Sequence, residues 1–416
     1  MKRGLRILES LITLTGMALL AGCAAVVESQ MLKNPRLAGM LDHRTSDRSI
    51  THTGRLEFIG NADTRIFVLH MYGNPYEMGY QHGKLLRAQV RASIADVMAG
   101  CDKFLPKFLR DAWWLTASDK RRIIEGILDR AWAELAPHTP PEDLEEMAGL
   151  AAGSGLPLAA IHRVHAIPDL GETSCSALLA KGTTTRDHHI YQLRILDYGS
   201  NFHLYRRPVI TVYHPPDGHA FINIGWAGFI GVVSGVNDQG VALSEMGFGN
   251  PPGETLEGEP MPFLLKNVLR YAGNAEEGAA IVRAAARTNS YIYFLGDPHG
   301  NAVGMITSAQ QCRTYRANET NELHVGNRNL PQYRDLIYAG HYVDKQGAWV
   351  RDHQGQLDLA AIQDLTRQIA TKSNLHTVIY DLTAGKFWVA NRTEATRAAD
   401  CQYVEFPLAP AWALHP

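Results

Sequence analysis

The sequence is poor in cysteine, in net charge and in long apolar runs. Five cysteines in 416 residues, with no CxxC pair and no His/Cys cluster at zinc-ligand spacing, predict neither a disulfide scaffold nor a metal site. Forty basic residues face 42 acidic ones, so the net charge of −2 supplies no field for nucleic acid, and we exclude that class of partner. The composition, 45% hydrophobic and 20% charged, is that of a globular protein. Nothing in it calls for a cofactor.

The first 22 residues have the pattern of a targeting signal. Three basic residues precede a short apolar core, and a small-residue motif ending in cysteine follows it: Lys2, Arg3 and Arg6, then Leu11–Leu20, then Leu-Ala-Gly-Cys at 20–23. The core is too short for a stable membrane anchor. The motif resembles a bacterial lipobox, which implies lipidation of Cys23.

We therefore expect a protein held to the bacterial cell envelope by an N-terminal lipid and facing the periplasm. The outer membrane is favoured because Ala24, and not Asp, follows Cys23. The alternative is an ordinary secretory signal with an incidental cysteine.

Patterning divides the mature chain into three parts. Residues 23–60 lack a clear period and are predicted to form a tether. Residues 61–174 contain a strand candidate at 65–71 and are otherwise mostly helical. From residue 175 to 416, strands come in groups, which predicts two antiparallel sheets between helical layers, an α+β fold. Helices are expected in this part near 260–271, 275–287, 331–340 and 358–371.

Two glycines of the helical segment stand out. Gly79 and Gly83 lie four residues apart in a helix predicted from Pro75 to about residue 100. They share one face, which permits the backbone of another helix to approach closely.

The chemistry is predicted around Cys175. Cys175 begins an apolar strand, a polar turn follows, and the return strand ends in Arg194-Ile195-Leu196-Asp197. A hairpin centred near residue 186 sets Asp197 opposite Cys175 and Arg194 opposite Leu178. Arg194 and Asp197 differ in parity, so both reach Cys175 only if a bulge intervenes or the strand ends by 197.

A thiol at this position needs a base, because only the thiolate is a good nucleophile. No histidine stands at a motif position. The α-amine of Cys175 can act as the base if the bond after Ser174 is cut, with Asp197 orienting the amine and Arg194 favouring the thiolate. The alternative is a small buried cysteine beside an ordinary ion pair.

These residues resemble the Cys-[Ser/Thr]…Arg-x-x-Asp signature of the N-terminal-nucleophile hydrolases, and most closely the acyl-coenzyme A:6-aminopenicillanic acid acyltransferase family. Its broader relatives include choloylglycine hydrolase, penicillin V acylase and acid ceramidase. The resemblance extends over about residues 65–406, through the segments at 73–83, 145–153, 228–231 and 235–241. It implies an αββα sandwich preceded by a pro-segment, and autocleavage between Ser174 and Cys175.

The resemblance also implies site residues: Cys175 as nucleophile, Arg194 and Asp197 as its partners, Asn237 and Asn327 as oxyanion-hole residues, and Arg334 as a substrate-binding arginine. The chain departs from the family pattern in three places: Ser174 replaces a common Gly, Asn-Arg at 327–328 replaces Asn-His, and Asp-His at 187–188 replaces Asp-Gly. Asn237 can instead be a turn former and Asn327 a loop residue.

Other residues have less specific interpretations. Trp113, Trp114 and Trp132 are expected in the core, with the lips of an acyl pocket as the alternative. Asn391 is expected to be structural. The remaining cysteines, Cys101, Cys312 and Cys401, are expected to be buried thiols, although an oxidising periplasm permits one disulfide.

The leading functional hypothesis is an amidohydrolase or acyltransferase that acts on a small-molecule amide and forms an acyl-thioester on Cys175. The two chains produced by autocleavage are expected to stay associated. A second hypothesis is a lipid hydrolase resembling phospholipase B-like proteins or ceramidases. A third is a lipid-anchored binding protein that has lost the activity. A papain-like protease is disfavoured, because its cysteine begins a helix whereas Cys175 begins a strand.

Overall fold

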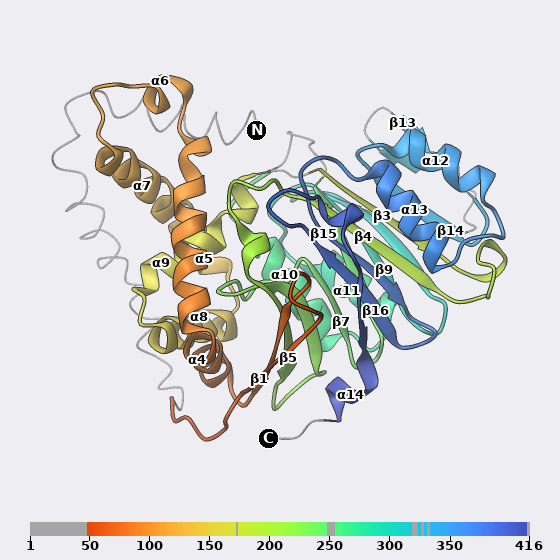
Figure 1. Cartoon of the computed structure of the whole chain (residues 1–416), viewed down its shortest axis with the longest axis horizontal. Coiled ribbons are helices and arrows are strands. Elements are labelled where there is room, and N and C mark those ends of the chain that lie inside the picture. Colours follow the sequence, from red (N-terminus) through yellow and green to blue (C-terminus); the bar gives the residue numbers. More distant parts are fainter. Residues whose placement is uncertain are drawn as a thin grey trace.

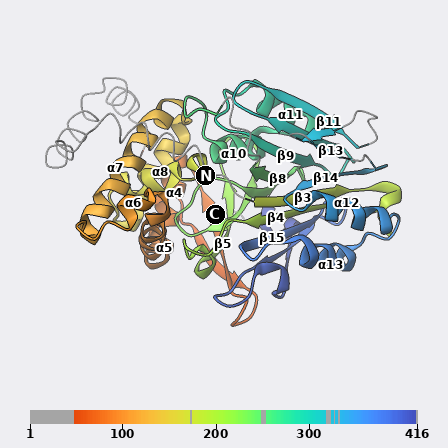
Figure 2. The same cartoon turned by 90° about the horizontal axis from the view of Figure 1, so that it is seen from above.

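The computed structural model describes residues 48–171, 174–247, 254–317, 323–325, 328–330 and 333–413. Two sheets face each other and helices cover their outer surfaces (Figures 1 and 2). This confirms the predicted α+β fold of two sheets between helical layers. Cys23 and the predicted targeting signal lie outside the described residues.

The first sheet has nine strands. Their spatial order is β1 (Arg55–Ile59), β2 (Ile66–Tyr72), β5 (Pro208–His214), β6 (Phe221–Trp226), β7 (Ser234–Asn237), β8 (Ala242–Gly247), β9 (Tyr291–Gly296), β10 (Ala302–Thr307) and β11 (Cys312–Arg316). All neighbours are antiparallel except β2 and β5, which run parallel. The prediction of purely antiparallel sheets is therefore wrong at this pair, where a strand from before Cys175 joins the sheet.

The second sheet has six antiparallel strands. Their order is β14 (Leu336–Gly340), β3 (Ser174–Ala180), β4 (Tyr191–Asp197), β15 (Asn374–Asp381), β16 (Lys386–Asn391) and β17 (Val404–Pro407). A separate short pair is formed by β12 (Leu323–Val325) and β13 (Arg328–Leu330). The helix expected at 331–340 is wrong, because Leu336–Gly340, which includes the β-branched Ile337 and the aromatic Tyr338, pairs as a strand with β3.

Helices form three groups. On the outer face of the first sheet lie α10 (Met261–Tyr271) and α11 (Ala275–Ala284), and on that of the second lie α12 (Val343–Asp352) and α13 (Leu359–Ile369) (Figure 2). Beside the first sheet stands the helical segment, α4 (Pro75–Leu85), α5 (Arg87–Ala99), α6 (Lys107–Arg110), α7 (Ala117–Leu135), α8 (Pro141–Ser154) and α9 (Leu158–Ala166) (Figure 1). The short helix α14 (Leu408–Trp412) follows β17.

Strand β2 confirms the strand candidate at 65–71. Strand β1 falls within residues 23–60, where the sequence predicts no strand. The single helix expected from Pro75 to about residue 100 is two helices, divided at Leu86.

Close packing of α4 on α8 confirms the expectation drawn from Gly79 and Gly83. A Cβ on Gly79 would overlap the Glu146 carbonyl oxygen, and one on Gly149 would overlap the Tyr76 carbonyl oxygen. Each helix thus presents glycines to the backbone of the other. Asn74 begins α4 by accepting a hydrogen bond from the Glu77 amide at 2.9 Å.

A buried ion cluster ties α8 to the sandwich. Lys266 of α10 donates to Asp143 at 2.7 Å and also to Glu146, while Tyr213 of β5 donates to Glu146 at 2.9 Å. All four side chains are buried. Removing one charge from such a cluster leaves the others without compensation, so the cluster fixes the position of α8.

We expect Gly79→Ala to lower the free energy of unfolding by roughly 1–3 kcal/mol, because its new methyl group must push two helix backbones apart. The matched control is Gly126→Ala in α7, where a Cβ meets nothing within 4 Å. That change should raise stability by about 0.5–1 kcal/mol, since alanine favours the helix. Urea unfolding measures both; equal effects of the two substitutions would show that the α4–α8 approach is not tight.

Candidate active site

The hairpin that carries Cys175 is paired one residue away from the predicted register. Cys175 faces Leu196, Asp197 faces Ser174, and Arg194 faces Ala177. The expected pairing of Asp197 with Cys175 is therefore wrong. The connection contains a 3₁₀ turn at Gly182–Thr184 and a left-handed His188 with φ 61°, so it is not symmetric about residue 186.

This register divides the site residues between the two faces of the second sheet. Directly opposed residues of antiparallel strands have their side chains on the same face of the sheet, and successive residues along one strand point to opposite faces. Cys175, Leu196 and Arg194 therefore share the face toward the first sheet. Asp197 and Ser174 share the other face, toward α13, where the Thr371 amide donates to both Asp197 carboxylate oxygens at 3.4 Å.

Arg194 is fully buried between the sheets and lies beside Cys175. Its guanidinium donates to Glu245 at 2.9 Å, to the Ile195 carbonyl at 2.5 Å and to the Val233 carbonyl at 3.4 Å. Burial alone would lower the pKa of Arg194. The charges of Cys175 and Glu245, together with a hydrogen bond to Cys175, outweigh this and raise the pKa above its usual value.

Glu245 is a site residue that the sequence analysis missed. It lies on β8, on the facing sheet, and its side chain is 3% exposed. Burial raises its pKa, although Arg194 opposes that shift. The sequence does contain a sign of this role, because Glu245 is the one charged residue in the otherwise mostly apolar run Val241–Met246. A charge buried in a strand needs a partner of opposite charge.

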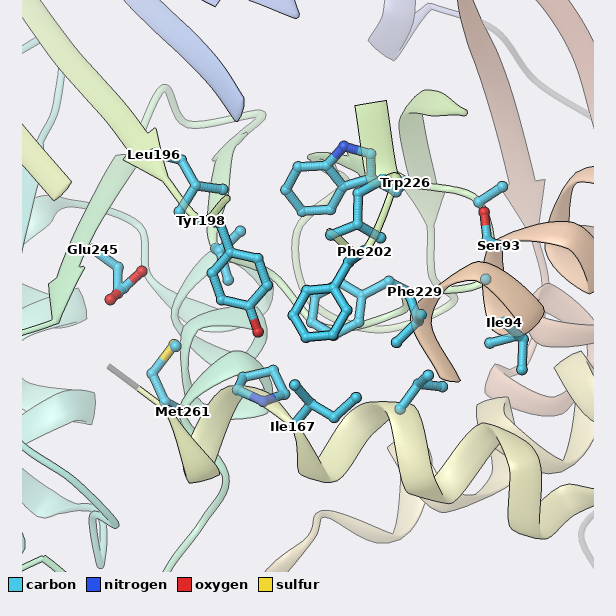
Figure 3. Close-up of a pocket in the computed structure, with 18 of the residues that line it drawn as sticks. Ser93, Ile94, Ile167, Leu196, Tyr198, Phe202, Trp226, Phe229, Glu245 and Met261 are labelled. Atoms are coloured by element: carbon cyan, nitrogen blue, oxygen red, sulfur yellow. The ribbon is translucent and has the colours of Figure 1, made fainter. Parts of the chain in front are cut away.

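An apolar cavity of about 80 Å³ is lined in part by Glu245, the counter-ion of Arg194. Its lining combines the helical segment, through residues such as Ile94 and Ile167, with the sheets and their loops, through Leu196, Trp226 and Phe229 (Figure 3). Glu245 lies at one edge of the cavity, and the Tyr198 ring projects into it (Figure 3). The space can hold a slender apolar group with one polar end near Glu245 and Arg194.

Asp197 has an environment suited to proton exchange. Burial raises its pKa to about 6, against the opposing effects of the Thr371 hydrogen bonds and the Arg194 charge. It stands opposite Ser174, so its carboxyl group lies beside the bond that joins Ser174 to Cys175 rather than beside the thiol.

The side chain of Asn237, a predicted oxyanion-hole residue, is fully used in structural hydrogen bonds. The Asn237 amide donates to the Leu269 and Ala272 carbonyls at 2.9 and 2.7 Å, and its oxygen accepts from the Gln239 and Val241 amides. Both of its N–H donors are thus occupied by the end of α10, and its oxygen is occupied by its own turn, which agrees with the turn interpretation.

Arg334 is exposed and stands beside the far end of β3. Leu336, two residues later, pairs with Ala180. Five residues of strand separate Ala180 from Cys175, roughly 17 Å. Arg334 therefore does not meet substrate at the thiol. Asn327 lies outside the described residues.

Two histidines come near Cys175 through the sheet. His341 donates its backbone N–H to the Cys175 carbonyl at 3.0 Å, which continues the β14–β3 register and sets His341 opposite Cys175. Its ring is exposed and packs edge-on against Tyr342. His376 pairs with Leu196, so it lies two strands from Cys175, roughly 10 Å away. Its ring contacts the Ser234 hydroxyl at 2.9 Å.

The remaining predictions have mixed outcomes. Cys101 is a buried thiol, and Cys312 and Cys401 are half-buried thiols; none of the described cysteines forms a disulfide. Trp132 is in the core as expected, but Trp113 and Trp114 are 90% and 62% exposed and line no part of the apolar cavity. They fall in the loop between α6 and α7, where they pack mainly on each other. Across the described ranges, no helix is long and apolar enough to cross a membrane.

We expect Glu245→Ala to destabilise the fold by roughly 3–5 kcal/mol, because it leaves the buried Arg194 charge without a counter-ion. The control is Glu276→Ala, which removes the half-exposed partner of Arg316 and should cost less than about 1 kcal/mol. Denaturant unfolding at neutral pH compares them. A Glu245 variant as stable as the control would show that Arg194 is not desolvated.

Comparison with known proteins gives relatives along most of the chain. Protein dcd1A of Dictyostelium discoideum is 26% identical over 376 residues, covering 83% of both chains. Protein dcd1B of the same organism is 28% identical over 264 residues, covering 62% of this chain and 53% of its own.

Solved structures match at lower similarity. A mutant conjugated bile acid hydrolase from Clostridium perfringens is 13% identical with a TM-score of 0.38, covering 57% of this chain and 93% of its own. The N-acylethanolamine-hydrolyzing acid amidase ortholog of Caenorhabditis elegans is 10% identical with a TM-score of 0.39, covering 56% and 100%.

A family model matches the part of the chain that follows β3, the strand that carries Cys175. Residues 185–340, from the hairpin turn to the end of β14, match the family of acyl-coenzyme A:6-aminopenicillanic acid acyl-transferase. The match includes Arg194, Asp197 and Glu245. The similarity to this acyl-transferase family that the motifs around Cys175 predict is therefore confirmed.

Proposed function

We propose that this protein is an amide hydrolase or acyltransferase in which Cys175 is the nucleophile. The observation that supports it most strongly is the position of Cys175 beside the buried Arg194 and opposite Leu196, which lines an apolar cavity. A guanidinium beside a thiol favours the thiolate, which is the nucleophilic form. The family match at residues 185–340 belongs to a group named for acyl transfer, which is the same reaction class.

The proposed reaction has two stages. The thiolate sulfur of Cys175 attacks the amide carbonyl carbon, and the tetrahedral oxyanion collapses with cleavage of the C–N bond. The base has taken the thiol proton, and in its protonated form it gives that proton to the leaving amine. The acyl group stays on sulfur as a thioester. Water then releases a carboxylic acid, or a second amine accepts the acyl group. Asn327 is the candidate oxyanion donor.

The cavity supports an apolar acyl group. Its lining is dominated by aliphatic and aromatic side chains, and Leu196, the direct neighbour of Cys175 on β4, is one of them. An acyl chain lying there brings its carbonyl carbon toward Cys175 and its apolar end toward α5 and α9. Burial of that chain contributes roughly 0.8 kcal/mol per CH₂ group.

The base is proposed to be the α-amine of Cys175, freed by autocleavage after Ser174. The thiol attacks the preceding carbonyl, the peptide nitrogen leaves as the α-amine, and water opens the resulting thioester. Asp197 lies opposite Ser174 and burial raises its pKa to about 6, which supports a role for it in exchanging a proton with that amine. Pairing of β2 with β5 and the Lys266 cluster would hold the two pieces together.

Intact-mass analysis of purified protein should show two chains, the second comprising residues 175–416. Cys175→Ala should remain one chain, because the attacking sulfur is gone. The control is Cys312→Ala, which removes a half-buried thiol from β11, the edge strand of the first sheet, and should cleave normally. An active, uncut wild-type chain would refute autocleavage, and His341 would then be the first base to examine.

Turnover of an apolar acyl amide should fall at least 100-fold in Asp197→Asn, which can no longer orient or exchange a proton with the amine. Arg194→Met combined with Glu245→Gln should also lose turnover while avoiding an unpaired buried charge. Arg334→Ala, at the far end of β3, is the control and should keep kcat and KM. Near wild-type kcat in the first two variants would contradict the proposed roles.

A lipid hydrolase is a second candidate, favoured by the apolar cavity and the proposed lipid anchor at Cys23. The same thiol and the same acyl-thioester would serve, with a lipid amide or ester as substrate. Comparing octanoyl p-nitroanilide with a long-chain ceramide as substrates separates the two. An enzyme of either kind is proposed to be attached to the cell envelope through Cys23.

A further inference from the structure

The wall of the apolar cavity includes a loop that connects β6 to β7, residues 227–233, here called the wall loop. Ala227, Gly228, Phe229 and Val233 line the cavity. The last of these also accepts the Arg194 hydrogen bond through its carbonyl oxygen. The position of this loop therefore affects both the shape of the cavity and the support of the guanidinium.

Two backbone N–H groups of the wall loop are held by histidine rings. The Gly228 amide donates to His82 Nε2 and the Ile230 amide donates to His165 Nε2, both at 3.0 Å. His82 comes from α4 and His165 from α9, so both belong to the segment before Ser174. Two hydrogen bonds thus cross from that segment to the wall of the cavity.

Only neutral histidines can make these bonds, because each ring uses the lone pair of Nε2. His165 Nδ1 lies 2.7 Å from the Ile161 carbonyl oxygen and donates its hydrogen to it, which leaves Nε2 as the acceptor. Both rings are buried. Burial, aided by the positive charge of Lys266, lowers the pKa of His165 to about 4, and burial with His165 and Lys266 lowers that of His82 to about 3. The acceptors persist at neutral pH.

His165 also positions a cavity side chain directly. Its ring stacks on Phe229 with centroids 5.1 Å apart and an interplanar angle of 7°. Figure 3 shows Phe229 at the side of the cavity near Ile94. Movement of the loop would carry this ring into or out of the cavity.

We propose that His82 and His165 are positioning residues that fix the wall loop and thereby determine which acyl groups the cavity admits. The part of this inference that concerns acyl groups rests on the proposed function. Neither histidine takes part in the reaction, since each imidazole acts through the loop. Loss of either acceptor leaves a buried N–H donor unpaired, which the loop can relieve only by moving.

The test compares His82→Leu and His165→Leu with His82→Gln and His165→Gln, because the glutamine carbonyl can replace Nε2 as acceptor. The matched control is His162→Leu, on the same helix as His165, where the ring stacks on Trp132 instead of holding the loop. Amide hydrogen exchange of peptides spanning 227–233 and the dissociation constant of cis-parinaric acid, a fluorescent C18 acid, are measured on the full chain. Neither readout requires turnover.

We expect the leucine variants to exchange at least tenfold faster in the wall loop and to bind the probe about tenfold more weakly. The glutamine variants should recover most of both, and His162→Leu should match wild type. When a series of amides with acyl groups of increasing length is assayed, the leucine variants should change the KM for amides of long acyl groups. The kcat for the acetyl amide should change less. Unchanged exchange, or glutamine variants as impaired as leucine variants, would overturn the positioning role.

Failure of the wild-type chain to bind the probe would overturn the link to acyl groups. Absence of amide turnover with intact exchange and binding differences would instead refute the proposed function alone. If a leucine variant does not fold, amide hydrogen exchange of the wild-type protein tests the positioning role instead. As the pH falls from 6 to 4, the protection of residues 227–233 should decrease more than that of β9, because a protonated histidine has no lone pair left to accept a hydrogen bond. Equal changes in both would contradict the inference.

Discussion

A guanidinium buried completely between two sheets is the constraint on which the site depends. Transfer of such a charge from water is unfavourable unless hydrogen bonds and a counter-ion compensate it. Here the second sheet supplies Arg194 and the Ile195 carbonyl, the first sheet supplies Glu245, and the loop before β7 supplies the Val233 carbonyl. The two sheets can approach only in the arrangement that satisfies this group, and that arrangement also places Cys175 beside it.

The junction between the helical segment and the sheets serves the same site. Glycine contacts set α4 against α8, and α8 in turn carries two carboxylates to Lys266. With α4 and α9 held in this way, their histidines reach the wall loop, which reaches Arg194 through Val233. The chain before Cys175 therefore contributes to the active-site region through packing, even though the proposed reacting groups lie after it.

Local patterns predicted much of this arrangement. The expected start of the first hairpin strand at Cys175 and end of the second at Asp197 agree with the structure to within one residue. The opposite parity of Arg194 and Asp197 indicates different faces, and the expectation that both reach Cys175 holds for Arg194 alone. The register was one residue off, because turn residues such as His188 adopt left-handed backbone that composition does not reveal. The strand at 336–340 was taken for a helix, because its identity depends on pairing with β3, a contact across about 160 residues of chain.

Long-range contacts also explain the errors among the site residues. Glu245 becomes part of the site only when β8 faces β4, and Arg334 leaves it because β14 pairs antiparallel with β3. The order of the motifs along the sequence predicts neither the inclusion of Glu245 nor the exclusion of Arg334. Conversely, exposed Trp113 and Trp114 show that aromatic residues beside an amphipathic helix are not always core residues.

The proposed reaction depends on acylation of Cys175, and peptide mapping after acid quenching detects this acyl group. Protein mixed with octanoyl p-nitroanilide should yield a peptide containing Cys175 that carries one octanoyl group, in an amount that rises and falls with turnover. The adduct should be absent from Cys175→Ala. Turnover without this adduct, or an octanoyl group found on a different residue, would contradict the account.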